Sequence, residues 1–132
     1  MTGGLYVPYK IDYNEAGYVE MIHDGIIAME HVSPIIKEVM TAVKDYDCFL
    51  FLGDYRGVDL QLSLALLYEI PRHVFGESQR LGLQVGKFKR ALVVSETLYE
   101  KFKFLELVSL NRMQNVKVFT DLTEAKIWLL SG

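Results

Sequence analysis

Cys48-Phe49-Leu50-Phe51-Leu52-Gly53 is the stretch of the sequence that decides the fold. It is a short, uninterrupted apolar run with an aspartate on either side. Such a run is typical of a strand that is buried on both faces, as in the interior of a parallel sheet. Two further runs of this kind follow, at Arg90–Ser95 and Val116–Phe119. Because parallel neighbours need a long crossover, the sequence predicts a mainly parallel α/β sheet.

Segments with helical spacing of apolar residues lie between these runs. We expect the first helix to open at Ser33-Pro34, because serine caps helix N-termini and proline suits the first helical position. It should end at Asp45-Tyr46-Asp47. The last two helices are predicted over 96–110 and 122–130, and Asp121 is the expected cap of the final one.

The helix after the central run is the most apolar of the set. Asp54-Tyr55-Arg56-Gly57-Val58 is predicted to be a polar turn, and Asp59 is the expected cap of a helix over 60–70. This helix is apolar nearly all round, which is typical of a helix buried on more than one side. Pro71 should end or kink it. Residues 72–86 fit either a second short helix or a loop.

An N-terminal hairpin is predicted before the first helix. Tyr9–Tyr13 and Tyr18–Gly25 have the pattern of strands, and Asn14–Gly17 supplies turn residues. Alternation in the second strand places one set of side chains on a buried face and another on a wetter face. The buried set is Val19, Met21 and Ile22, and the wetter set is Tyr18, Glu20 and His23.

The predicted order is therefore β-β-α-β-α-β-α-β-α in a single domain over 1–132. The chain has 132 residues, which is one domain's worth. Hydrophobic residues make up 51% and charged residues 23%, so a disordered chain and a disulfide scaffold are excluded. The net charge of −3 includes no basic block, so no nucleic-acid partner is expected.

The C-terminal stretch from Asn111 to Leu129 resembles the signature of the SpoIIAA-like (STAS-like) family. It contains a valine-rich strand ending in Phe119, an acidic turn, and a helix that carries Glu124-Ala125 and Trp128-Leu129. The resemblance covers about residues 6–130 and implies a SpoIIAA-like fold. The family often has glycine after the Asn-Arg pair, whereas Met113 stands there in this chain. The same residues also have structural roles, since Asp121 caps a helix, Ala125 permits close packing and Trp128 covers the core.

The resemblance also suggests a phosphorylation site. In anti-sigma-factor antagonists, a serine at the start of the corresponding helix is phosphorylated, and Ser63 is the nearest serine here. The family's Asp-Ser-Ser/Thr-Gly pattern is replaced by Leu62-Ser63-Leu64-Ala65. We therefore interpret Ser63 as a buried or back-bonding helix serine, with a phosphosite as the alternative.

Asp54, Tyr55, Arg56 and Asp59 are the candidate binding residues, because ligands of parallel α/β sheets bind at the carboxyl ends of strands. They can hold a small polar ligand or a partner chain, or Asp54 and Arg56 can pair with each other. An enzyme would need a histidine beside this turn. His23, His31 and His73 lack metal-ligand spacing, and no catalytic motif is present, so no catalytic residue, metal or cofactor is predicted.

Two further features have plain interpretations. Lys87, Lys89 and Arg90 form a short basic cluster, which we interpret as a solvated face. Cys48 is interpreted as a buried thiol, and a lone free cysteine fits a reducing cytoplasm. No apolar stretch is long enough for a transmembrane helix.

The function expected from these features is a non-enzymatic regulatory or protein-interaction module. Mean hydropathy is +0.17, so an apolar interface and a homodimer are expected. The expected interface residues are Leu64, Leu67, Tyr68 and Phe75. The alternative is a small-ligand domain, because STAS-like and similarly built Sec14-type domains include binders of nucleotides or lipids. A cavity beneath residues 60–83 would hold an apolar molecule.

Overall fold

The structure is a computed structural model that describes residues 9–132. Its five strands form one sheet in sequence order, with β1 and β2 antiparallel and every other neighbouring pair parallel. The strands are β1 (Tyr9–Asn14), β2 (Tyr18–Ile27), β3 (Leu50–Leu60), β4 (Lys89–Val93) and β5 (Asn115–Phe119). The predicted α/β class, the parallel sheet and the antiparallel N-terminal hairpin are thereby confirmed.

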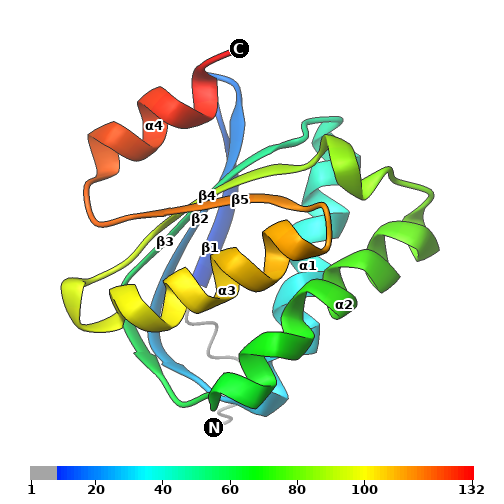
Figure 1. The fold of residues 1–132 in the computed structure, drawn as a ribbon. Coiled ribbons are helices and arrows are strands. Elements are labelled where there is room, and N and C mark those ends of the chain that lie inside the picture. Colours follow the sequence, from blue (N-terminus) through cyan, green and yellow to red (C-terminus); the bar gives the residue numbers. More distant parts are fainter. Residues whose placement is uncertain (1–8) are drawn as a thin grey trace, which may run out of the picture.

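The helices cover the sheet unequally. Three helices lie on one face of the sheet and α4 lies on the other, as Figure 1 shows. Within the layer of three, α2 packs between α1 and α3. The helices are α1 (Met29–Tyr46), α2 (Leu64–Leu81), α3 (Tyr99–Asn111) and α4 (Leu122–Leu130), with short 3-10 turns η2 (Val85–Lys87) and η3 (Glu96–Leu98). The helix predicted over 96–110 is therefore divided: its first residues form η3, and α3 begins at Tyr99.

Each face of the sheet has its own apolar core. The larger core joins the inner sides of α1, α2 and α3 to the sheet, and the smaller core lies under α4. In the smaller core Ala125 is fully buried, and the rings of Phe119 and Trp128 lie 5.8 Å apart. Asp121 accepts a hydrogen bond from the Glu124 amide at 2.9 Å. The predicted structural roles of these C-terminal residues are confirmed.

β3 is much longer than predicted, because a bulge carries it through the expected turn at 54–58. Ile22 pairs with Asp54, but Asp24 pairs with Gly57, so Tyr55 and Arg56 both lie opposite the single residue His23. An extra residue shifts the alternation of a strand by one position. Residues on the helix-layer face are odd-numbered before the bulge and even-numbered after it. Asp59 is therefore a strand residue and not a helix cap.

α2 begins later than predicted and runs through Pro71. The side chain of Ser63 caps it by accepting a hydrogen bond from the Leu66 amide at 3.2 Å. Ser63 is exposed, so its interpretation as a buried or back-bonding serine is wrong. Pro71 is buried in the helix interior, where tertiary packing outweighs the lost backbone hydrogen bond. Residues 72–81 continue the helix as far as Gly82.

α1 begins earlier than predicted, which makes Pro34 an interior residue. Its N-cap is Ala28, whose amide donates to Nδ1 of His31 at 2.9 Å. This imidazole takes the role that a Glu or Gln side chain has in a capping box. Ser33 is consequently not a cap, and the predicted start at Ser33-Pro34 is wrong.

The three helices of the layer all end in a Schellman motif, which needs a left-handed residue just past the helix. That residue is Asp47 (φ 50°) after α1, Gly82 (φ 74°) after α2 and Met113 (φ 64°) after α3. After α3, Met113 donates to the Leu110 carbonyl and Gln114 donates to the Ser109 carbonyl. The methionine therefore occupies a backbone conformation that favours glycine.

The predicted faces of β2 are confirmed for Val19 and Met21, which are buried, and are wrong for Ile22, Tyr18 and His23. His23 is only 1% exposed and points into the helix layer with Val19 and Met21. Tyr18 is buried in the core under α4, whereas Ile22 is half-exposed. Both faces of β2 therefore carry buried side chains. The helix layer covers one face, and the core under α4 includes Tyr18 on the other face.

Candidate functional site

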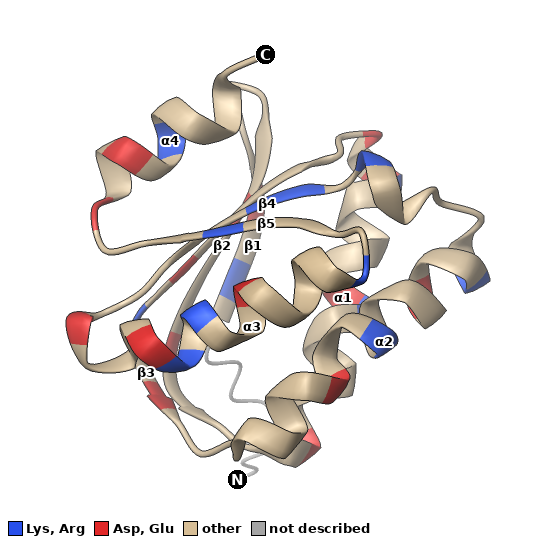
Figure 2. Ribbon diagram, in the orientation of Figure 1, with Lys and Arg blue, Asp and Glu red and all other residues tan. Residues whose placement is uncertain are grey.

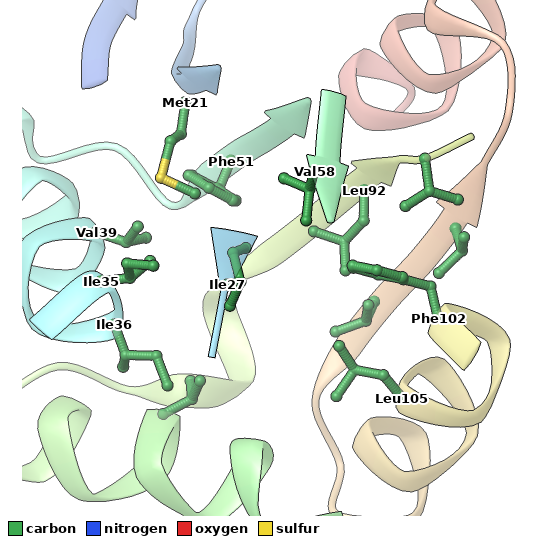
Figure 3. Close-up of a cluster of buried hydrophobic side chains, with 14 of the residues drawn as sticks. Met21, Ile27, Ile35, Ile36, Val39, Phe51, Val58, Leu92, Phe102 and Leu105 are labelled. Carbon is green, nitrogen blue, oxygen red and sulfur yellow. The ribbon is translucent and has the colours of Figure 1, made fainter. Parts of the chain in front are cut away.

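An apolar cavity of about 100 Å³ lies between α2 and the sheet. α2 contributes Leu67 and Val74 to its lining, and the sheet contributes Phe51 and Leu92 from β3 and β4. Figure 3 shows how side chains from α1, α3 and the sheet gather in this part of the core. A void of this size is uncommon in a close-packed interior, although it is smaller than most ligand pockets.

Among residues 9–132, Arg90 is the one charged residue in the cavity lining. It is the second residue of β4, is 8% exposed, and lies with its guanidinium carbon 5.3 Å from the ring centre of Phe88. Within residues 9–132 no carboxylate pairs with it, and its Nε has no hydrogen-bond partner. Burial lowers the pKa of Arg90 to about 10, so the side chain remains charged at neutral pH. A buried cation without a counter-charge is costly.

Gln114 connects this arginine to the helix above it. Its Oε1 accepts from Nη2 of Arg90 at 2.7 Å, and its Nε2 donates to the Pro71 carbonyl at 2.7 Å. Gln114 is buried and directly follows the left-handed Met113. One side chain thus joins β4, the end of α3 and the proline turn of α2.

Tyr55 adds a phenol to the cavity wall beside the buried imidazole of His23. The centre of the Tyr55 ring lies 5.6 Å from that of Phe102 and 6.3 Å from that of His23. Burial raises the pKa of Tyr55 and lowers the pKa of His23, so both side chains are neutral at pH 7. In the described chain neither ring nitrogen of His23 has a hydrogen-bond partner. Unpaired polar groups around an apolar cavity are characteristic of binding sites.

The sequence interpretation missed Arg90 and His23. The expected solvated face of Lys87, Lys89 and Arg90 is wrong for Arg90, which points into the helix layer like Leu92 two residues later. That alternation was a usable signal, because an interior strand buries both of its faces. His23 likewise follows Val19 and Met21 at a spacing of two.

The four residues predicted to bind a ligand do not form one site. Tyr55 faces the cavity, whereas Asp54 and Arg56 lie on the opposite face and pair with each other. Arg56 donates to both carboxylate oxygens of Asp54, at 2.9 and 2.8 Å. Burial of Asp54 opposes its ionisation, but the hydrogen bonds from Arg56 outweigh it and hold the pKa of Asp54 below its usual value. Asp59 is exposed, and its carboxylate accepts a hydrogen bond from Gln61 instead of joining this pair.

The predicted interface residues divide into two groups. Leu64, Tyr68 and Phe75 are each about half-exposed on the outer side of α2. Leu67 is 1% exposed and lines the cavity, so its assignment to an interface is wrong. Helix geometry explains the division, because only one stripe of α2 faces the sheet.

The remaining candidates show no further site. Among the described residues no group of histidine, cysteine and acidic side chains could hold a metal ion, and none of the three histidines hydrogen-bonds to Asp54 or Arg56. Cys48 is half-buried rather than fully buried. Figure 2 shows acidic and basic residues interspersed along the helices. Over residues 9–132 no helix combines the length and apolar character that crossing a bilayer requires.

Comparisons with solved structures identify the fold. An anti-sigma factor antagonist from Mycobacterium paratuberculosis has 14% sequence identity and a TM-score of 0.59, with 93% of each chain covered. An uncharacterised DUF3478-family protein with a SpoIIAA-like fold from Shewanella loihica PV-4 has 18% identity and a TM-score of 0.52. That match covers 92% of this chain and 91% of the other. Neither the models of known protein families nor the curated proteins give a match to this sequence.

The chain therefore has the SpoIIAA-like, or STAS-like, α/β fold, as the C-terminal resemblance implies. The fold places α2 at the carboxyl end of β3 and leaves the cavity beneath it.

Proposed function

We propose that this chain is a non-enzymatic regulatory module whose state is set by a small, mainly apolar ligand held between α2 and the sheet. The observation that carries the proposal is the cavity of about 100 Å³ with a charged, incompletely bonded Arg90 in its wall. A core selected for stability alone would fill the void and replace the cation. Both features lower the stability of the empty protein, and a ligand would offset both.

The position of α2 supports a regulatory role. α2 rests on α1 and α3, and its inner residues Leu67 and Val74 line the cavity. Its outer residues Leu64 and Phe75 are half-exposed. A ligand that changes the packing of the inner stripe therefore acts on the outer stripe, where a partner would bind.

The test is a titration with benzyl alcohol, a neutral probe of one aromatic ring, followed in methyl NMR spectra. We expect shifts at the methyl groups of Leu67 and Val74 and none at the exposed Leu64. Val74→Phe fills the cavity and should abolish the shifts, whereas Leu64→Phe on the outer side of α2 should preserve them. Shifts that are absent from the wild-type cavity methyls, or that survive Val74→Phe, would overturn the proposal.

Self-association through α2 is the second part of the proposal. Exposed apolar side chains in a row are a frequent feature of interfaces, and Leu64, Tyr68 and Phe75 form such a row. Light scattering should give twice the chain mass of 15.1 kDa. Phe75→Glu should give the monomer, and the control Leu130→Glu on α4 should remain a dimer. A wild-type monomer across the concentration range would refute this part.

A phospho-switch at Ser63 is the second candidate function. One observation favours it: Ser63 is exposed at the N-terminus of α2, where Lys101 donates to the adjacent Leu62 carbonyl at 3.2 Å. A helix N-terminus and a nearby cation both stabilise a phosphate group. Mass spectrometry of protein from its native cells should then find phosphate on the peptide that contains Ser63. Phosphate found only elsewhere, or none, would remove this candidate.

A further inference from the structure

Arg90 narrows the chemistry of the ligand. Its guanidinium has five N–H donors, yet within the described chain it donates only to Gln114. The face of the group toward Phe88 is occupied by the aromatic ring, so the unused donors lie around the rim of the guanidinium. Donors in the plane of a guanidinium match a carboxylate, which accepts two parallel hydrogen bonds.

The size of the cavity limits the body of the ligand. An apolar cavity of roughly 150 Å³ is known to hold benzene, and this cavity measures about 100 Å³. A full lipid chain does not fit in the present arrangement of the helices. The cavity is therefore smaller than one that holds benzene, so a short branched chain fits it as it stands and one aromatic ring fits only if the lining side chains move apart.

The polar groups in the cavity wall limit the charge that the ligand can carry. In the described part of the chain Arg90 is the only ionised side chain of the lining, and Tyr55 supplies a neutral phenolic hydroxyl. One cation balances one negative charge, whereas a phosphate dianion would leave charge uncompensated in an apolar site.

We infer that the cavity takes a small organic monoanion, a carboxylate with an apolar body no larger than one ring, whose charge pairs with Arg90. This inference rests on the proposed ligand-binding function and names its ligand class. Tyr55 brings a neutral phenol to the same cavity wall. Binding would satisfy the unpaired Nε of Arg90 and fill the void in one step.

The test compares sodium benzoate with benzyl alcohol, which has the same ring but no charge, by calorimetric titration at pH 7. Wild-type protein should bind benzoate more tightly than benzyl alcohol. Arg90→Met, which keeps an apolar side chain of similar length, should weaken the binding of benzoate by at least about tenfold more than it weakens the binding of benzyl alcohol. Arg56→Met is the matched control at an exposed arginine and should bind both probes like the wild type.

NMR tests the same contact without a variant. The Nε–H resonance of Arg90 should shift on addition of benzoate and not on addition of benzyl alcohol. The Nε–H of Arg56, already bonded to Asp54 at 2.9 Å, is the internal control and should not move. Equal affinity for the two probes, or benzoate binding that survives Arg90→Met, would overturn the carboxylate inference and leave the apolar site standing. Failure of both probes to bind wild-type protein would overturn the proposed function as well.

Discussion

Arg90 donates a 2.7 Å hydrogen bond to Gln114, a residue 24 positions later in the chain, and both side chains are buried. Gln114 is held in turn by the Pro71 carbonyl and by the Schellman motif that ends α3. The arrangement fixes a cation in the core without neutralising it. Four predictions follow from the way the chain builds this site.

Removing the buried charge should stabilise the empty protein. Arg90→Met replaces a desolvated cation with an apolar side chain of similar length, at the cost of one unpaired amide oxygen on Gln114. The free energy of unfolding should rise by about 1–3 kcal/mol in urea denaturation at pH 7. Arg56→Met removes an exposed ion pair and should change stability by at most about 1 kcal/mol. A less stable Arg90→Met would show that the arginine is a structural residue.

Glycine at position 113 should stabilise the chain. Met113 has a φ of 64° and is 85% exposed, so its side chain adds backbone strain without burying much apolar surface. The left-handed conformation costs a non-glycine residue roughly 1–2 kcal/mol, and the greater freedom of unfolded glycine offsets part of the gain. Met113→Gly should therefore raise the free energy of unfolding by about 0.5–1 kcal/mol.

The converse substitution at α2 is the control. Gly82 occupies the same position of the same motif with a φ of 74°. Gly82→Ala should destabilise by about 1 kcal/mol in the same denaturation experiment. If both substitutions shift stability in the same direction, the strain assigned to Met113 is wrong.

His23 should make folding stability depend on pH. Burial lowers its pKa in the folded protein, so the unfolded chain binds a proton first as the pH falls. This contribution to stability is fully present above the unfolded pKa of about 6.5 and is lost progressively below it. Each unit by which the pKa is lowered is equivalent to about 1.4 kcal/mol.

The measurement is the free energy of unfolding between pH 5 and pH 8. His23→Phe should flatten the slope below pH 6.5, because the replacement ring does not titrate. His73→Gln, at an exposed position of α2, should retain the wild-type slope. A wild-type slope that is unchanged in His23→Phe would mean that other groups set the pH dependence.

Gly53 should be required for the position of Tyr55. A Cβ at Gly53 would overlap the Tyr55 ring, which lies in the cavity wall. Gly53→Ala should therefore displace the phenol, destabilise the protein by about 1–3 kcal/mol and weaken the binding of benzyl alcohol. Gly76→Ala on α2 meets open space and should stabilise the helix by up to about 1 kcal/mol. If Gly53→Ala binds benzyl alcohol as tightly as the wild type, Tyr55 does not contribute to the binding site.

The sequence was enough to predict the order of elements, the parallel sheet and the hairpin, because buried strands and amphipathic helices carry periodic apolar patterns. It was not enough to predict the bulge opposite His23. Polar residues such as Asp54 and Arg56 look like a turn in the sequence, but in the fold they pair with each other on an open face of β3. One missed bulge moved the expected cap from Ser63 to Asp59 and the start of α2 by four residues.

The site was predicted only in part, for a related reason. Tyr55 was predicted as a binding residue from its place near the end of a strand. Arg90 and Gln114 are far apart in the sequence, and they are partners only because the fold brings β4, the residue before β5 and the middle of α2 together. Charged residues are usually exposed, so a basic cluster favours a solvated face. A buried charge breaks that rule, and such exceptions concentrate where a protein binds something.

The central claim is that the space between α2 and the sheet is a ligand site. The most direct test is the observation of nuclear Overhauser effects between the ring protons of bound benzoate and the protein's methyl groups. We expect contacts with Leu67, Val74 and Leu92, which line the cavity on both sides. Contacts restricted to exposed methyl groups such as those of Leu64 and Leu110, or no contacts at saturating benzoate, would contradict it.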